Sequence, residues 1–545
     1  MADQSAHAEA VPSQQLSKVA DARKGRVSSA TQIPRTGNIS CPVDHRNMQR
    51  RTVIVGHIAQ LISSNKRWQP ALKKQPEETM NKATAVASKV LSAFESKVDS
   101  RATRVGIIGL GYVGLPLALL FAREGFSVSG FDLDADKVAK LRRGESYISH
   151  IPATTIAEQV DQKRLEVTTD FAHLKEMDAI LICVPTPLDS HREPDLSYVC
   201  GTAEAIAPHL QRGQLVVLES TTYPGTTEEV VLPILEKSGL QCPVCLYATN
   251  GFEVTAGEER QSDFLLAFSP EREDPGNKQF QTHQVPKIIG GINASSARAA
   301  QALYAEAFEK TFLVSSARAA EMTKILENTY RCVNIALVNE LKLLCLRMGI
   351  DIWEVIEAAK TKPFGFTAFY PGPGLGGHCI PIDPFYLTWK AREYEFPTRF
   401  IELAGEINSS MPEHVLAAVT EALNQRKQCL QDARILVLGV AYKKDIDDQR
   451  ESPSLRIIEL LQGKGARVDY HDPYFPHLPK MRNYRFDLKS VDLSPEILAG
   501  YDAVVIATDH SNYDYHAIVR HARLVVDTRN ATHGVEEHRE KIVRC

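Results

Sequence analysis

Two pairs of side chains, each four residues apart, carry the groups in this chain that could do chemistry. The first pair is Cys379 and Asp383, which follow the glycine-rich run 372–377 in GPGLGGHCIPIDP. A thiolate attacks carbonyl carbon well, and nearby ammonium groups or backbone N–H dipoles lower the pKa of a thiol. Asp383 could act as a base or orient a water molecule, whereas the adjacent His378 is expected to point away from the cysteine.

The glycines before Cys379 have two explanations. They could form a structural turn that happens to precede a cysteine, because glycine adopts turn conformations at low steric cost. Alternatively, they could remove side chains where a substrate has to approach the sulfur. The second interpretation is favoured.

The second pair, Lys324 and Asn328, lies in EMTKILENTYRCVNIALVNELKLL (321–344), whose periodicity predicts a long helix. Residues four apart project from one face of a helix. A solvated lysine beside an asparagine is the ordinary interpretation, but in a cleft both groups could donate to an oxyanion. The apolar residues expected to form the packed face are Met322, Ile325, Leu326, Val333, Leu337 and Leu341.

Two further polar groups follow strand-like runs. Thr221 stands at the tip of the run before ESTTYPGTTEEV (219–230), and Glu271 lies at the turn SPERED (269–274). Helix caps and turns explain such residues equally well. Doubly wound sheets, however, bind ligands at the carboxyl ends of their strands, so both residues are candidates for a site.

A cofactor site is indicated by Gly109-x-Gly111-x-x-Gly114, which follows a short apolar run and opens a predicted helix. The first glycine allows a tight turn, the second lets the backbone approach a pyrophosphate, and the third lets helix and strand pack closely. Asp132 ends the next predicted strand, where a carboxylate accepts hydrogen bonds from the adenosine ribose. Its charge would repel a 2′-phosphate, so NAD is favoured over NADP. A glycine turn without a nucleotide is the alternative.

Strand and helix signals alternate twice along the chain, on either side of a mainly helical stretch. Such alternation predicts parallel, doubly wound sheets. The expected fold class is α/β, with two Rossmann-like domains joined by a central helical domain. The expected boundaries are a partly disordered N-terminal extension over 1–100 with an amphipathic helix at 82–98, an NAD-binding domain over 101–304, the helical domain over 305–425 and the second Rossmann-like domain over 426–545.

Composition excludes several classes of protein. The 545 residues carry a net charge of −4, which gives no electrostatic reason to expect nucleic acid or an anionic membrane as a partner. Ten scattered cysteines favour reduced thiols, and the close pair Cys242 and Cys245 lacks the further ligands of a zinc site, so no metal is expected. No apolar run is long enough to span a membrane, and the N-terminus lacks a secretory pattern. A cytoplasmic protein is expected.

From about residue 104 to residue 535 the chain resembles the nucleotide-sugar 6-dehydrogenases, which include UDP-glucose and UDP-N-acetylhexosamine dehydrogenases. Eight motifs occur in the order of that family: GLGYVGLPLA, GFDLD, CVPTP, ESTTYPGTT, LAFSPERE, EMTKILENTYR, GPGLGGHCIPIDP and GVAYKKDIDDQRESP. REPDLSYV and GHCIPIDP are most similar to the UDP-N-acetylglucosamine branch, since UDP-glucose enzymes more often have a lysine at Ile382. Lys362 and Pro363 stand where those enzymes often carry an arginine. The first hundred residues lie outside the family pattern.

The resemblance implies a mechanism. The C6 alcohol of a UDP-sugar is oxidised twice with NAD, and the intermediate aldehyde is captured on Cys379 as a thiohemiacetal. This becomes a thioester, which water hydrolyses to the uronate. Lys324 and Asn328 match the pair that stabilises alkoxide and oxyanion charge, and Asp383 matches the acid, base or water-orienting carboxylate.

The same resemblance implies the remaining contacts and partners. Thr221 and Glu271 match residues around the catalytic water. The cofactor contacts, beside the glycine motif and Asp132, are Tyr112, Val113, Pro185, Thr186 and Thr221. The substrate contacts are Glu271, Lys324, Asn328, Gly376, Gly377, Lys443 and Arg529, of which Arg529 is the weaker because surface arginines are common. The central helices form a homodimer in the family, so a homodimer or higher homo-oligomer is expected.

Three alternatives stay open. The substrate could be UDP-glucose or UDP-N-acetylmannosamine. A two-electron dehydrogenase of the hydroxyacid type would need no thiol at Cys379. A non-catalytic homologue would lack the cysteine, Lys324 or Asn328, and all three positions are filled. The sequence therefore favours a four-electron UDP-N-acetylglucosamine 6-dehydrogenase.

Overall fold

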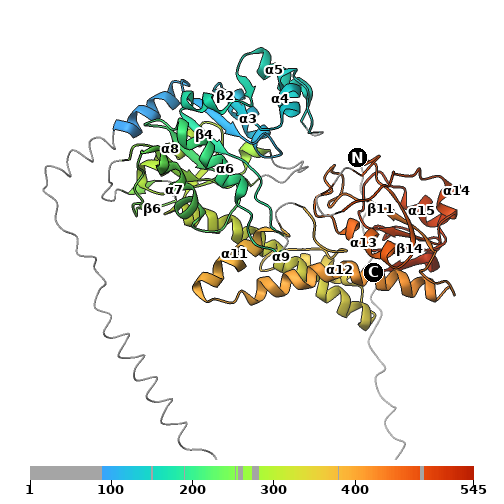
Figure 1. Ribbon diagram of the computed structural model, residues 1–545. Helices are drawn as coiled ribbons and strands as arrows, with labels where there is room; N and C mark the ends of the chain where they lie inside the picture. Colours follow the sequence, from blue (N-terminus) through green and yellow to red (C-terminus); the bar gives the residue numbers. More distant parts are fainter. Residues whose placement is uncertain are drawn as a thin grey trace, which may run out of the picture. The chain divides into compact units, whose positions relative to one another are not determined.

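The computed structural model describes residues 89–148, 151–189, 191–251, 253–255, 262–272, 281–377, 380–478, 481 and 484–545 (Figure 1). The expectations for residues 1–88, for His378 and for Cys379 lie outside these ranges. Residues 89–99 of the expected extension are helical. Leu91, Phe94 and Val98 pack into the core of the first domain, so the end of this segment belongs to the folded domain.

The first domain is built on an eight-stranded sheet with the order β10-β9-β8-β5-β4-β1-β2-β3. Its strands are β1 (Arg104–Ile108), β2 (Ser127–Phe131), β3 (Leu165–Thr168), β4 (Ala179–Ile182), β5 (Leu215–Leu218), β8 (Leu265–Phe268), β9 (Lys287–Gly291) and β10 (Thr311–Leu313). All neighbours run parallel except β8 and β9. Because β10 joins this sheet, the sheet continues past the expected domain boundary at residue 304.

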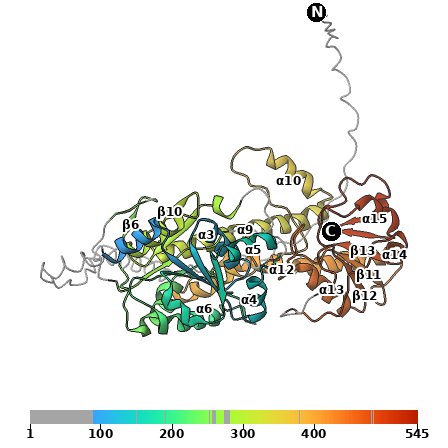
Figure 2. The same ribbon diagram turned by 90° about the horizontal axis from the view of Figure 1, so that it is seen from above.

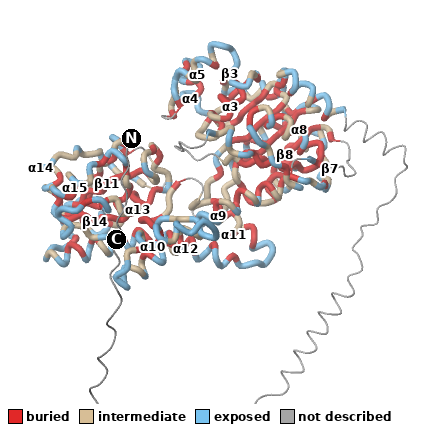
Figure 3. The backbone as a smooth tube through the Cα atoms, turned by 180° about the vertical axis from the view of Figure 1, so that it is seen from behind, coloured by how far each residue is buried: buried red, intermediate tan, exposed pale blue. Residues whose placement is uncertain are grey.

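Helices cover both faces of this sheet, which is why its central strands are apolar along their whole length. Alternation along β1 shows the two faces: Ile107 packs with α3 and α8, and Ile108 packs on the other side with α6 and α7. The helices are α3 (Gly114–Arg123), α4 (Ala135–Arg142), α5 (Ala153–Asp161), α6 (Ser197–Ile206), α7 (Leu232–Leu235) and α8 (Ala294–Ala305). Figure 3 shows the buried residues in the interior of the domain and the exposed residues mostly at its periphery.

The central helices are α9 (Ala317–Met348), α10 (Ile352–Lys360), α11 (Asp383–Ala391) and α12 (Arg399–Asn424). The side chain of Ser316 caps the start of α9, and Gly349, with φ of 70°, ends it in the left-handed conformation. Helices α9 and α12 lie side by side (Figure 2), joined by a hydrogen bond of 2.9 Å from Asn339 to Asn408.

The packed face expected for α9 is wrong in most of its residues. Ile325 is buried, but Met322, Leu326, Leu337 and Leu341 are exposed. The helix instead turns a face of small and polar residues toward the rest of the chain, namely Ala320, Glu321, Lys324, Asn328, Cys332, Ala336 and Asn339. Side-chain hydrogen bonds compensate the burial of several of these polar groups.

The last domain has a five-stranded parallel sheet of order β12-β11-β13-β14-β15. Its strands are β11 (Arg434–Leu438), β12 (Arg467–His471), β13 (Ala503–Ile506), β14 (Val525–Asp527) and β15 (Ile542–Arg544), and its helices are α13 (Pro453–Gly463), α14 (Pro495–Ala499) and α15 (Tyr515–His521). The α/β fold with two sheets and a central helical domain is confirmed. The strand order reverses between β1 and β4 and between β11 and β13, where open α/β sheets bind ligands.

Candidate active site

The glycine motif forms the turn between β1 and α3, and each glycine has the geometry its role requires. Gly109 has φ of +91°, and a Cβ atom there would lie 2.7 Å from the carbonyl oxygen of Cys183. A Cβ atom on Gly114 would collide with the carbonyl oxygen of Gly109, whereas one on Gly111 would meet nothing within 4 Å. Gly111 therefore leaves open space where a pyrophosphate could approach the backbone, and the loop fits a dinucleotide.

Asp132 follows β2 and lies against this turn. Its carboxylate accepts hydrogen bonds from the backbone N–H of Leu110, at 3.0 Å, and of Asp134, at 2.9 Å. Tyr112 and Val113 stand in the turn before α3 and are half-buried. The cofactor side chains predicted there are thus gathered at the carboxyl ends of β1 and β2.

Two more predicted cofactor residues meet at the neighbouring strand ends. Thr186, after β4, donates a hydrogen bond of 2.8 Å from its hydroxyl to the backbone oxygen of Thr221, after β5. Pro185 is exposed beside them. The hydroxyl of Tyr386 in α11 donates to the backbone oxygen of Thr186, which ties the central helices to this edge of the sheet.

The polar face of α9 brings together three of the predicted catalytic residues. Lys324 and Asn328 are both buried, and Asn328 Nδ2 donates a hydrogen bond of 2.6 Å to Asp383 Oδ2 at the start of α11. Burial raises the pKa of Asp383 to about 7, although the charge of Lys324 and the hydrogen bond from Asn328 act to lower it. A carboxyl group that titrates near neutrality is suited to acid–base chemistry.

Glu271 belongs to a buried charge cluster. Lys287 Nζ lies 3.0 Å from Glu271 Oε2 and 2.6 Å from Glu219 Oε2, and the hydroxyl of Tyr304 donates to Glu219. Burial acts to raise the pKa of Glu271, but the charge and hydrogen bond of Lys287 hold it below its ordinary value. Burial raises the pKa of Glu219 to about 7.

Lys287 is a residue of this cluster that was not predicted from the sequence. Its signal was a lysine at the start of the apolar strand KIIGG, where a charged side chain is only tolerated with partners. The two carboxylates supply them.

The glycines before Cys379 pack against side chains of the last domain. A Cβ atom on Gly372 would collide with Arg529, and one on Gly376 would lie 2.5 Å from Cβ of Tyr442. Gly377 has φ of +92°, and its N–H donates to the backbone oxygen of Arg450 at 3.0 Å. Substrate access was the favoured explanation, but close packing against the last domain is a sufficient reason for these glycines.

Lys443 and Arg529 follow β11 and β14, at the carboxyl edge of the second sheet. Arg529 Nε donates to the backbone oxygen of Ala507 at 3.0 Å, and burial lowers the pKa of this guanidinium. Arg529 is therefore not the freely solvated surface arginine considered as its alternative. Lys443 is half-buried.

A cavity of about 750 Å³ lies beside the loop that carries Cys379. It is lined from the first domain, the central helices and the last domain by residues that include Pro187, Leu188, Gly374, Leu375, Ile380, Pro381, Ile382, Asn408, Pro453 and Arg456. Its lining includes residues that precede and follow Cys379 in the sequence. A cavity of this volume can admit a substrate. Among the described residues no group of three or more His, Cys, Asp or Glu side chains could hold a metal ion.

Comparison with known proteins identifies the family to which the three domains belong. Residues 103–308 match the NAD binding domain of the UDP-glucose/GDP-mannose dehydrogenase family, residues 318–410 its central domain, and residues 436–534 its UDP binding domain. The chain belongs to this family. It is an oxidoreductase, an NAD-dependent UDP-sugar 6-dehydrogenase. The glycine turn lies in the family's NAD binding domain, while Lys443 and Arg529 lie in its UDP binding domain.

Two family members illustrate the similarity. The chain is 34% identical over 412 residues to the UDP-N-acetyl-D-glucosamine 6-dehydrogenase of Pseudomonas aeruginosa. The aligned residues cover 75% of this chain and 91% of that protein. It is 35% identical over 434 residues to the UDP-N-acetyl-D-mannosamine dehydrogenase of Pyrococcus horikoshii, which covers 78% of this chain and 95% of that one.

A solved structure of a relative has the same fold. The structure of the P. horikoshii UDP-D-ManNAc dehydrogenase superposes with a TM-score of 0.70 at 33% identity, covering 81% of this chain and 98% of that one. None of the described helices is long and apolar enough to cross a membrane.

Proposed function

We propose that this enzyme oxidises the C6 alcohol of UDP-N-acetylglucosamine to the uronate in two successive two-electron steps at one site. The observation that carries the proposal is the buried contact of Asn328 with Asp383, next to Lys324, in a structure whose thiol loop borders a large cavity. The P. aeruginosa relative supports the choice of sugar, and UDP-N-acetylmannosamine, named for the P. horikoshii relative, is the nearest alternative.

The first oxidation needs a group that takes the proton of the C6 hydroxyl. The glycine turn and Asp132 would hold NAD⁺, which would supply the acceptor for the C6 hydride in each of the two oxidations. Asp383 accepts the hydroxyl proton as hydride leaves, and Lys324 and Asn328 donate hydrogen bonds to the oxygen as negative charge develops on it. A buried site strengthens these interactions because water does not screen them.

The second oxidation depends on Cys379. Its thiolate adds to the aldehyde carbon, forming a C–S bond, and the former carbonyl oxygen takes up a proton to give the thiohemiacetal. Loss of that proton and of the second hydride yields the thioester. Water then attacks C6, the C–S bond breaks, and the uronate leaves as the thiol is restored. Glu271 and Thr221 orient the water molecule that attacks the thioester.

Substrate binding uses the last domain. Lys443 and Arg529 are cations at the carboxyl edge of its sheet and are suited to phosphate oxygens. Gly376 and Gly377, which stand three and two positions before Cys379 in the sequence, contact the sugar in this proposal. We also propose that the protein is cytoplasmic; the eight described cysteines are all free, and reduced cysteines are usual in that compartment.

We also propose that the enzyme is a homodimer formed through the central helices. Leu326 and Leu337 on α9 are 60% and 50% exposed. Further exposed apolar side chains on the same side of this helix are Met322, Tyr330, Leu341, Leu344 and Met348. A second copy of α9 would present the same apolar face, and such self-complementary contacts are typical of twofold dimers.

The decisive experiment measures NADH formed per UDP-sugar consumed by the purified protein, using UDP-N-acetylglucosamine, UDP-N-acetylmannosamine and UDP-glucose in parallel. Two NADH per sugar, with the highest kcat/KM for UDP-N-acetylglucosamine, are expected. A ratio of one would exclude the four-electron mechanism, and a higher kcat/KM for another sugar would exclude the proposed substrate.

Replacing the thiol tests the covalent step. Cys379→Ser is expected to lower uronate formation at least ~1,000-fold, because an alcohol is a far weaker nucleophile than a thiolate. Cys429→Ser, at an exposed cysteine of the last domain, is the matched control and should keep wild-type turnover. Near-normal uronate formation by Cys379→Ser would contradict the mechanism.

A further inference from the structure

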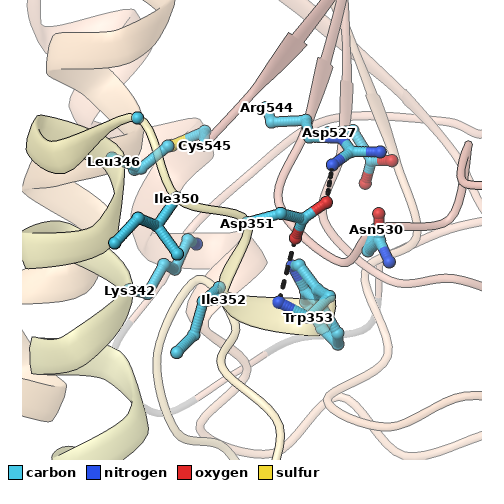
Figure 4. A pocket seen from close by; sticks show the side chains of 11 residues that line it. Lys342, Leu346, Ile350, Asp351, Ile352, Trp353, Asp527, Asn530, Arg544 and Cys545 are labelled. Atoms are coloured by element: carbon cyan, nitrogen blue, oxygen red, sulfur yellow. Dashed lines mark hydrogen bonds and ion pairs between the residues drawn. The ribbon is translucent and has the colours of Figure 1, made fainter. Parts of the chain in front are cut away.

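A second, smaller cavity of about 240 Å³ lies where the end of α9 and the turn into α10 meet strands β14 and β15 (Figure 4). Its lining residues are Lys342, Leu346, Gly349, Ile350, Asp351, Ile352, Trp353, Asp527, Asn530, Arg544 and Cys545. It shares no lining residue with the cavity beside the thiol loop, and none of the residues assigned to the reaction lines it.

Both carboxylates of this cavity are already committed to protein donors. Asp527 accepts from the backbone N–H groups of Arg529 and Ala531 through one oxygen, and from the N–H and hydroxyl of Thr532 through the other. Asp351 accepts from the N–H of Trp353 at 2.9 Å and pairs with Arg544, as Figure 4 shows. Arg544 is likewise compensated.

Two polar atoms of the lining stay without a hydrogen-bond partner within the described part of the chain. They are Nζ of Lys342, whose residue is only 2% exposed, and the buried Oδ1 of Asn530. Burial lowers the pKa of Lys342 and the charge of Arg529 acts in the same direction, although the charges of Cys545 and Asp527 act to raise it. A buried ammonium and a buried amide oxygen without partners are each costly, so the cavity contains one unmatched cation and one unmatched acceptor.

We infer that this cavity is a binding site for a small organic carboxylate that also carries a hydroxyl or amide hydrogen. The carboxylate would accept from Lys342, and the hydroxyl or amide would donate to Asn530. The apolar walls formed by Leu346, Ile350 and Ile352 would cover the carbon skeleton.

The size of the cavity limits the ligand. At roughly 30 Å³ per water molecule, a volume of about 240 Å³ corresponds to a ligand of monosaccharide size. It is below the roughly 300–1,000 Å³ of pockets that enclose larger ligands, so a UDP-sugar is excluded. Binding of this ligand does not rest on the proposed function, because neither NAD nor UDP takes part in it; its effect on the catalytic helix does.

The cavity lies between helix α9 and the last domain, so a ligand bound there would contact both. Lys342 lies on α9, the helix that carries Lys324 and Asn328, while Asn530 follows Arg529 in the last domain. A bound carboxylate would therefore connect the helix of the catalytic groups to the domain that binds UDP. We expect it to stabilise one arrangement of the two.

Calorimetric titration of the full-length protein with D-glucuronate tests the inference, with D-glucose as the uncharged control. UDP at saturating concentration is present throughout, so that heat from the UDP site is excluded. Glucuronate is expected to bind and glucose to bind at least 10-fold more weakly. Absence of glucuronate binding, or equal binding of glucose, would overturn the inference.

Two substitutions locate the bound anion. Lys342→Met removes the cation, and Asn530→Asp adds a negative charge while keeping a residue type that tolerates the φ of 57° at this position. Each should weaken glucuronate binding at least 10-fold, whereas Lys310→Met, at an exposed lysine of the first domain, should leave it unchanged. Unchanged binding in both cavity variants would place the ligand elsewhere and refute the site. If Lys342→Met does not fold, the result with Asn530→Asp decides.

Discussion

At the scale of single residues, Asp383 couples the chemistry of the site to the stability of the fold. Its pKa of about 7 in the folded protein lies above the value near 3.9 of an unfolded chain. The protonated form therefore favours folding. This contribution is complete below about pH 4 and is lost as pH rises through 7.

Asp383→Asn is accordingly expected to raise the free energy of unfolding at pH 8 relative to the wild type, by an amount on the order of 4 kcal/mol. The asparagine can still accept from Asn328, so the packing is kept. The difference should shrink toward zero at pH 4. Urea denaturation between pH 4 and 8 measures it, with the exposed Asp161→Asn as control. A difference independent of pH would show that Asp383 does not titrate in this range.

Lys287 compensates two buried carboxylates, and its loss removes the positive charge that they share. Lys287→Met is expected to destabilise the protein by about 3–5 kcal/mol, the usual cost of removing one partner from a buried ion pair. Adding Glu219→Gln should recover part of that loss, because one uncompensated charge disappears. Chemical denaturation at pH 8 compares the two variants. Equal stability of the single and double variants would mean that Glu219 is not paired as described.

At the scale of elements, the loop 372–377 positions the thiol segment by its fit against the last domain. In Gly376→Ala the new Cβ would meet Cβ of Tyr442 at 2.5 Å and the backbone oxygen of Glu451 at 3.0 Å. We expect the loop to shift by a fraction of an ångström or more, which lowers kcat by about 100-fold with little change in melting temperature. Gly463→Ala is the matched control, since a Cβ atom there meets nothing within 4 Å. Wild-type kcat in Gly376→Ala would show that the fit is not needed.

The strands and the glycine turn were predictable from the sequence because they depend on local patterns. The apolar runs at 104–108, 179–182, 215–218 and 434–438 are all strands, since parallel strands buried on both faces need unbroken apolar segments. The cofactor glycines were predictable for the same reason: turn geometry depends on a few adjacent residues.

Pairings between distant segments were not predictable in the same way. Periodicity identified α9, but could not show which of its faces meets the chain and which stays exposed. The ion pairs of Lys287 join residues 16 and 68 positions away. Glycine suits positions 372 and 376 because the side chains of Arg529 and Tyr442 pack against them. Sequence alone does not place these two side chains beside the loop. The contact of Asn328 with Asp383 spans 55 positions, and only the family resemblance brought these two residues together.

At the scale of the whole molecule, the exposed apolar side of α9 makes oligomeric state testable. Leu326→Lys places a charge in the proposed interface and is expected to convert the dimer to a monomer at micromolar concentration, because a buried unpaired charge is costly. Analytical ultracentrifugation gives the mass. Leu246→Lys, at a leucine that is 88% exposed in the first domain, should stay dimeric. A wild-type protein that sediments as a monomer would contradict the proposal.

The fit between the glycines of 372–377 and the last domain also limits how this enzyme can be recombined. Gly372 and Gly376 lie in the middle of the chain, whereas Arg529, Pro453 and Tyr442, which border the loop's glycines, come from the last domain. A chimaera that takes its last domain from a relative keeps the thiol segment in register only if it brings matching residues at these three positions. In such a chimaera the loop and the last domain therefore have to be exchanged together, although some eighty residues of helix and strand separate Gly376 from Pro453.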